Sequence, residues 1–244
     1  MLANVIPFLA FLAILASGLN SGSDDKKLEE LEVVTEEPEV VVEKEEKPFR
    51  YNPPKHHEKL WDSAEIKPAF VFKIDKAIAL YLDRKEIYDD IENMRDGGVP
   101  SAIVFTLHGR ESTWNLNKHL HEGSPLTGKT KWVPKGRPKS PPANGHTYTF
   151  NESAEDALYK LKDLETINWS RCDDALYNIE KYNGLGYLKY RNINSPYLWS
   201  GTYHYTMGKY VADGKYSRTA VDKQLGTCAI LLRMVDRNIN VGFN

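Results

Sequence analysis

The stretch VPSAIVFTLHGRESTWNLNKHLHEGSPLTGKT, residues 99–130, is the segment around which we expect the rest of the chain to be arranged. Pro100 suits the first turn of a helix, and apolar residues recur after it at helical spacing. At about 100° per residue, one stripe of this helix carries Ile103, Leu107, Glu111 and Trp114. Glu111 is therefore predicted to lie among core residues and not on a solvated face.

Glu111 also stands near the expected C-terminal end of this helix, where the helix dipole disfavours a negative charge. Burial among apolar side chains disfavours ionisation as well, so both effects are expected to raise the pKa of this carboxyl. A carboxyl group that keeps its proton near neutral pH can act as a general acid. The alternative is a structural role, in which Glu111 pairs with a neighbour such as Arg110, His108 or Lys118.

Five short blocks of the sequence resemble, together and in this order, a group of phage and bacterial proteins of the lysozyme-like superfamily that degrade peptidoglycan. The blocks are HGRES (108–112), HLHEGSPLTGKT (119–130), VPKGRP (133–138), YNGLGY (182–187) and SPYLWSGT (195–202). The likeness runs from about Trp61 to Arg233, and within the superfamily the chain is similar in particular to the lytic transglycosylase and goose-type branch. It implies an α+β, mainly α, lysozyme-like domain with a small β or loop subelement beside the catalytic helix.

The resemblance implies a glycosidase that needs no cofactor and cleaves the β-1,4 bond between N-acetylmuramic acid and N-acetylglucosamine in peptidoglycan strands. It assigns Glu111 as the general acid and base. Tyr182 and Asn183 match the Tyr-Asn pair that lines the superfamily's cleft beside the catalytic Glu. Further candidates for substrate binding are Ser112, His121 and Thr127.

The second acidic residue is the main departure from these relatives. They read Asn-Gly-Asp-Pro-Leu where this chain has Glu-Gly-Ser-Pro-Leu at 122–126, so Ser124 replaces the expected Asp. Glu122 and Asp213 are the candidates to take its place. Both hydrolysis, as in a lysozyme, and formation of a 1,6-anhydro sugar, as in a lytic transglycosylase, therefore stay open.

Two other classes of function compete with the glycosidase: a metal-dependent wall peptidase or amidase, and a non-catalytic glycan-binding or virion protein. Residue types that bind metals do gather in one part of the chain, namely His108, Glu111, His119, His121 and Glu122. Their spacing lacks the HExxH pattern of zinc peptidases, and we predict no metal site. His119 and His121 are expected to order a loop or to line the cleft.

The formal net charge of −2 hides an uneven distribution. Acidic side chains concentrate in residues 24–47 and the remainder is basic, which favours attraction to an anionic polymer such as the cell wall. The loop over residues 129–139 is basic, but no nucleic-acid motif accompanies it, so we predict no nucleic-acid binding. A monomer is expected. Cys172 and Cys228 could form a disulfide or remain two buried thiols.

The N-terminal part is expected to serve delivery and not catalysis. Residues 1–23 contain an apolar run from Val5 to Leu19, which is short for a membrane span and suits a signal peptide or a membrane anchor. Residues 24–59 are expected to be an acidic, disordered linker in which the His56–His57 pair is solvated. Residues 60–244 would then be the catalytic domain of a protein that is exported or membrane-anchored and acts in the periplasm or cell wall.

Apolar spacing and capping signals predict the other helices of this domain. They cover residues 68–95, 149–164, 170–182 and 217–236, and Gly184 is expected to stop the third of them. Thr149 and Glu152 form a capping box for the second of these helices. Ser170 and Ser217 are the expected caps of the third and fourth. No helix fits residues 115–148, which are rich in proline and glycine and hold the small β-element in the superfamily.

Overall fold

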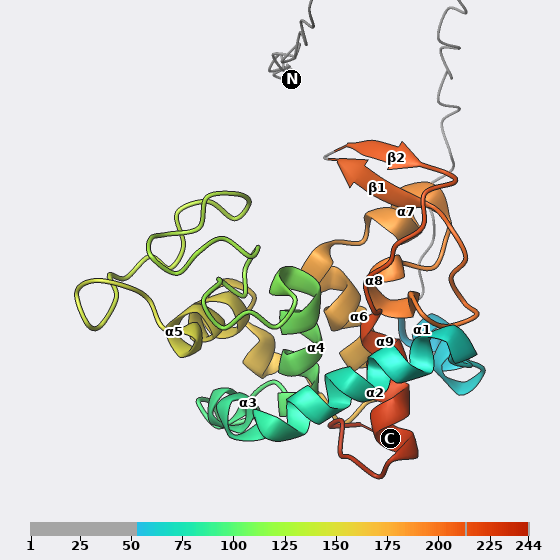
Figure 1. The fold of residues 1–244 in the computed structure, drawn as a ribbon, viewed down its shortest axis with the longest axis horizontal. Helices are drawn as coiled ribbons and strands as arrows, with labels where there is room; N and C mark the ends of the chain where they lie inside the picture. The colour runs from blue at the N-terminus through green and yellow to red at the C-terminus, as the bar shows by residue number, and fades with distance from the viewer. Residues whose placement is uncertain (1–52, 213, 244) are drawn as a thin grey trace, which may run out of the picture. The chain divides into compact units, whose positions relative to one another are not determined.

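Helix α4, Ser101–Ser112, is the helix expected from the apolar spacing after Pro100. In this computed structural model, which describes residues 53–212 and 214–243, α4 lies in the middle of the described elements (Figure 1). Each of its residues from Ser101 to His108 is buried, so this part of the helix is enclosed on every side. The last turn, with Arg110 and Glu111, is only partly buried. The exposed end of α4 is therefore the end that carries Glu111.

Other helices surround α4 and build the core. α3 (Lys85–Glu92) and α9 (Thr227–Asp236) pack against α4, and α2 (Pro68–Asp83) packs against α9. The one long helix predicted over residues 68–95 is wrong, because the chain leaves helical geometry at Arg84 (φ −115°, ψ 16°). The break lets both Tyr88 and Tyr81 approach Phe105 of α4, with ring centroids 5.3 Å from it in each case.

Helix α1 (Pro53–Asp62) corrects part of the predicted linker. It packs against α6 (Cys172–Asn183), and His57 is completely buried in that contact. His57 is therefore not solvated, and the disordered linker is wrong for residues 53–59, since Glu180 of α6 supplies a buried partner for this histidine. The expected signal or anchor segment and the rest of the linker lie in residues 1–52, outside the described residues. Within the described part of the chain, no helix is both long and apolar enough to cross a bilayer.

The capping box at Thr149 and Glu152 is confirmed, and it begins α5 (Phe150–Glu155). The chain continues as the π-helix η1 (Asp156–Leu161) and the 3-10 helix η2 (Leu164–Thr166). α6 ends at Gly184 as predicted. Its expected cap is wrong, because Arg171 occupies the N-cap position while the Ser170 hydroxyl donates to Asn168 at 2.7 Å.

The C-terminal third holds α7 (Gly186–Arg191), α8 (Pro196–Trp199) and a hairpin of β1 (Lys209–Ala212) and β2 (Lys215–Ser217). The predicted start of the last helix is wrong, because Ser217 ends β2 and its hydroxyl oxygen accepts from the Ala220 N–H. The described part is thus mainly helical with one two-stranded antiparallel sheet, which confirms the coarse α+β, mainly α class.

The β-element was expected in the wrong segment. Residues 115–148 hold no strand, only an isolated bridge between Lys118 and Pro125, and the sheet lies instead at residues 209–217. Figure 1 shows this segment as a long loop beside α4, away from the hairpin. Its many prolines and glycines disfavour a regular ladder, and side-chain hydrogen bonds hold the loop in place of one.

Candidate active site

A pocket of about 420 Å³ opens where α4 ends. Segments far apart in the sequence contribute its walls: the last turn of α4, the loop after it, the end of η1 and the end of α6. The lining residues are Glu111, His121, Glu122, Val133, Pro134, Leu161, Lys162, Tyr182 and Asn183. This lining includes one lysine, Lys162, which the sequence did not single out. The candidates that the structure brings together in this pocket are Glu111, His121, Glu122, Tyr182 and Asn183.

Glu111 is held in the pocket by one strong hydrogen bond. The hydroxyl of Tyr197, from α8, donates to Glu111 Oε1 at 2.8 Å. Burial raises the pKa of the Glu111 carboxyl to about 7, and the hydrogen bond from Tyr197 opposes this rise. Among the nearby charges, Arg110 and Lys162 also lower this pKa, whereas Glu122 raises it. A carboxyl with a pKa near 7 has both protonation states available at neutral pH.

The end of α4 is fixed by residues that follow Glu111. Thr113 caps the helix in the left-handed conformation (φ 55°), and Trp114 then folds back so that its Nε1–H donates to the Phe105 carbonyl at 3.0 Å. Gly109 makes this possible, because a Cβ at that position would lie 2.5 Å from the Trp114 ring. The helix therefore ends one turn after its enclosed part, with Glu111 directed to the pocket.

Glu122 lies beside Glu111 because Gly123 allows a close approach of the loop. Gly123 has a φ of +80°, and a Cβ there would lie 2.5 Å from the carbonyl oxygen of Glu111. The hydroxyl and the N–H of Ser124 both donate to Glu122 Oε1. Its Oε2 is buried without a hydrogen-bond partner among the described residues. Ser124, which replaces the expected Asp, thus orients Glu122, while Asp213 lies outside the described residues.

Tyr182 and Asn183 line the same pocket as Glu111, as the resemblance implies. They form the last turn of α6, which Gly184 ends. Tyr182 is buried, and its hydroxyl donates to the Leu120 carbonyl at 3.0 Å, so its ring and not its hydroxyl faces the pocket. Asn183 is exposed and its amide remains available for a ligand.

Of the three other candidates, Ser112 and Thr127 lie outside the pocket lining, whereas His121 lines the pocket and orders its wall, as expected. Ser112 is buried and its hydroxyl donates back to the His108 carbonyl at 3.3 Å, and Thr127 is exposed outside the pocket lining. His121 does line the pocket, but Asp156 and Ser153 occupy its two ring nitrogens at 2.8 and 3.3 Å. Neither Ser112 nor Thr127 is therefore a pocket residue, and His121 orders the wall.

The loop that forms this wall is tied down by a chain of polar contacts. His119 bonds to Ser153 at 2.9 Å and to the Gly128 carbonyl at 2.7 Å. Arg137 Nε donates to Asp156, which also binds His121. Both histidines are thus used within the protein, and the described residues contain no group of three or more His, Cys, Asp or Glu side chains placed to hold a metal.

Sequence reasoning missed Tyr197 and Lys162 as neighbours of Glu111. Tyr197 lies in the SPYLWSGT block, 86 residues after Glu111, and its ring packs under Arg110 with the guanidinium 4.9 Å from the centroid. Arg110 is fixed in turn by Asp222 at 2.9 Å. The SPYLWSGT block was a signal for Tyr197, whereas nothing in the local sequence distinguishes Lys162 from the other lysines.

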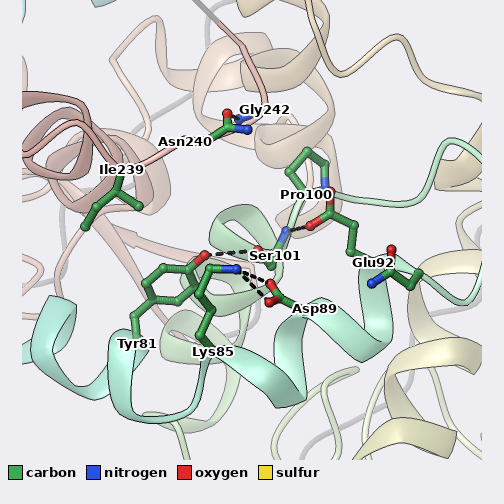
Figure 2. Close-up of a pocket in the computed structure, with 10 residues that line it drawn as sticks. Tyr81, Lys85, Asp89, Glu92, Pro100, Ser101, Ile239, Asn240 and Gly242 are labelled. Carbon is green, nitrogen blue, oxygen red and sulfur yellow. Dashed lines mark hydrogen bonds and ion pairs between the residues drawn. The ribbon is translucent and has the colours of Figure 1, made fainter.

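A second pocket, of about 300 Å³, lies between α2, α3, the start of α4 and the C-terminal segment (Figure 2). Its polar groups bond to one another. Lys85 Nζ contacts both oxygens of Asp89 at 2.6 and 2.7 Å, and the Tyr81 and Ser101 hydroxyls are 2.9 Å apart. The Ser101 N–H donates to Glu92 Oε2 at 2.8 Å. These groups satisfy each other, so the Glu111 pocket is the better candidate for chemistry.

Neither cysteine is among the residues that line the Glu111 pocket. Cys172, at the start of α6, and Cys228, in α9, are both buried and both free thiols.

In comparisons with known proteins, the chain matches no family model, no curated protein and no solved structure.

Proposed function

We propose that the protein is a peptidoglycan-degrading glycosidase of the lysozyme or lytic transglycosylase type, with a lysozyme-like domain. One observation carries the proposal: Glu111, whose carboxyl has a pKa of about 7, faces a pocket that is open to a ligand. The resemblance of the HGRES and YNGLGY blocks supports the substrate class, because Glu111 and the Tyr182–Asn183 pair share that pocket.

The pocket offers what a sugar needs. Val133, Pro134 and Leu161 supply apolar surface for the C–H faces of a ring, and the Tyr182 ring adds an aromatic face. Asn183 can both donate to and accept from sugar hydroxyls. The proposed substrate is one glycan strand of peptidoglycan, cut at the β-1,4 bond by a monomer that is exported or anchored at the membrane through its N-terminal segment.

Cleavage would begin when Glu111 gives its proton to the glycosidic oxygen as the C1–O bond breaks. The bonding electron pair leaves with that oxygen, and positive charge develops on the sugar ring. Glu111, now anionic, then takes a proton from the nucleophile that adds to C1. Water yields a reducing end, and the sugar's own 6-hydroxyl yields a 1,6-anhydro end. Glu122 faces the same pocket and can stabilise the positive charge in either route.

The test is release of muropeptides from purified peptidoglycan by the full chain, followed by mass spectrometry. Glu111→Gln should lower the rate by several powers of ten, because the amide cannot give or take the proton. Glu155→Gln is the matched control, since Glu155 forms surface ion pairs with Arg95 and Lys160 away from the pocket. Anhydro ends identify the transglycosylase route and reducing ends the lysozyme route. Equal rates for wild type and Glu111→Gln would refute the proposal.

A further inference from the structure

Lys162 is the one lining residue of the Glu111 pocket that carries a positive charge. It follows directly after η1, and α6 holds its side chain in place. Lys162 Nζ donates to the Tyr182 carbonyl at 3.3 Å and lies 5.4 Å from the centroid of the Tyr182 ring. Lys162 is exposed overall, and these two contacts hold its ammonium group beside Tyr182, another residue of the pocket wall.

The positive charge of Lys162 is not neutralised by an ion pair. Among the described residues no carboxylate pairs with it, whereas Lys160, two residues earlier, binds Glu155 at 2.8 Å. Its charged neighbours are Glu111, which attracts it, and Lys181, which repels it. When Glu111 is protonated, as it must be before catalysis, that attraction disappears. With Glu111 protonated, Lys162 therefore presents at the pocket wall a positive charge that no carboxylate pairs with among the described residues, and Glu122 is the remaining acidic residue of the lining.

A cation in such a position favours an anionic ligand over a neutral one. Neutral sugar hydroxyls need only hydrogen bonds, which the exposed Asn183 amide can offer. Bacterial wall glycan differs from chitin by its carboxylates, which lie on the lactyl ether of muramic acid or on the stem peptide attached to it. Both sources present the same chemistry to an ammonium group within reach of the scissile bond.

We propose that Lys162 is a specificity-determining residue that binds a carboxylate of the glycan strand beside the bond that Glu111 protonates. This inference rests on the proposed function, which it deepens by naming the substrate feature that the pocket selects. The competing explanation is that Lys162 acts only on Glu111, by lowering the pKa of its carboxyl. That role would alter the pH dependence for every substrate equally and would leave the preference among substrates unchanged.

The experiment compares the full chain with Lys162→Gln and Lys162→Arg on three substrates: intact peptidoglycan, glycan strands freed of stem peptides by an amidase, and soluble neutral chitin oligomers. Lys160→Gln is the control, since it removes a charge two residues earlier, at the end of η1 and outside the pocket lining. Lys162→Gln should raise KM about five- to tenfold on carboxylate-bearing substrates with little change in kcat. It should leave KM on chitin unchanged, and Lys162→Arg should restore most of the loss.

The substrate arms also identify the carboxylate. In intact peptidoglycan the lactyl carboxyl is bound in an amide to the stem peptide, and the amidase frees it as a carboxylate. An effect confined to the stripped strands therefore points to the lactyl group, one confined to intact peptidoglycan points to the stem peptide, and an effect on both means that Lys162 accepts either carboxylate. An equal loss on all three substrates, or no loss on any, would overturn the inference.

Binding provides a readout that does not depend on cleavage. Affinities for fragments of the stripped strands, of intact peptidoglycan and of chitin are measured in the Glu111→Gln background, with and without Lys162→Gln. A preference for either carboxylate-bearing fragment that disappears with Lys162 supports the inference even if no variant cleaves glycan, in which case the proposed function alone fails. A preference that survives the loss of Lys162, or none at all, refutes the inference whatever the rates are.

Discussion

Two carboxyl groups that burial affects alike are Glu111, partly buried at the end of α4, and Glu180, fully buried in α6. Burial raises the pKa of each, and each is bound by one side chain from a distant segment: Tyr197 at 2.8 Å and His57 at 2.7 Å. They differ in access. Glu111 faces a pocket, whereas Glu180 is 1% exposed and lies in the α1–α6 contact. A raised pKa therefore marks burial, and only an opening to a ligand makes it useful for chemistry.

The partners differ in a second way. The Tyr197 phenol can only donate its proton to the Glu111 carboxylate, and it has no positive charge to offer. The imidazole of His57 can carry a positive charge, so the His57–Glu180 contact can be an ion pair that joins α1 to α6. We infer that the Tyr197–Glu111 contact keeps a proton available for transfer. The His57–Glu180 contact instead fixes α1 onto α6, the helix that ends in Tyr182 and Asn183.

The largest expected difference between the two carboxyls concerns stability. Glu180→Ala leaves His57 buried without its carboxylate, and removal of one partner from a buried pair costs roughly 3 kcal/mol or more. Its effect on the turnover of the folded fraction should be small, because Glu180 does not line the pocket. Urea unfolding, together with activity measured well below the denaturation midpoint, checks both parts. A fully stable variant would show that the contact does not hold α1.

Glu111→Gln should affect stability in the opposite direction. A carboxyl whose pKa is raised from 4.5 to about 7 in the folded state destabilises the fold as the pH rises through that interval. The neutral amide avoids this cost, so the variant should match wild type near pH 4 and exceed it by up to roughly 3 kcal/mol at pH 8. Unfolding free energies of both proteins over this range measure the difference. A gap that does not grow with pH would mean that Glu111 is not buried as described.

The same residues show which features of the fold could be predicted from the sequence. Helical spacing of apolar residues predicted α4, although the structure encloses residues 101–108 on every side and places Glu111 in a partly buried last turn. The capping box of α5 and the Gly184 end of α6 were also predictable, since they depend on local backbone chemistry. The break at Arg84 was not, because the apolar period is the same on both sides of it.

Other features could not be predicted because they depend on contacts between segments that are far apart in the sequence. The burial of His57 depends on Glu180, 123 residues away, and the neighbours of Glu111 include Tyr197, 86 residues away. The proline- and glycine-rich loop gave no sign of its hydrogen bonds to the π-helix, through which Asp156 holds both His121 and Arg137. The resemblance named the segments that form the pocket, and geometry was needed to show which of their side chains reach it.

A smaller effect, on the pH dependence of activity, is expected from Tyr197→Phe. Loss of the hydrogen bond to the carboxylate should raise the pKa of Glu111 above 7, because this contact favours the ionised form. A general acid is lost as the pH rises through its pKa, so the alkaline limb of kcat/KM should move up by about one pH unit. Tyr205→Phe is a control, since its hydroxyl donates to the Gly208 carbonyl and not to a pocket residue. An unmoved limb would exclude Tyr197 as the residue that tunes Glu111.

The smallest expected shift has the opposite sign and concerns Glu122. Its negative charge raises the pKa of Glu111, so Glu122→Gln should lower that pKa and move the alkaline limb down by a few tenths of a pH unit. If proximity of charge is its whole role, kcat below the limb should fall less than about tenfold and the released ends should not change. A loss of about a thousandfold or more would instead make Glu122 a catalytic carboxylate that stabilises the sugar cation or activates water. Ser124→Ala separates the two cases further, because it removes the hydroxyl that orients Glu122 but keeps its charge. It should leave the limb in place, and it should lower kcat only if Glu122 is catalytic.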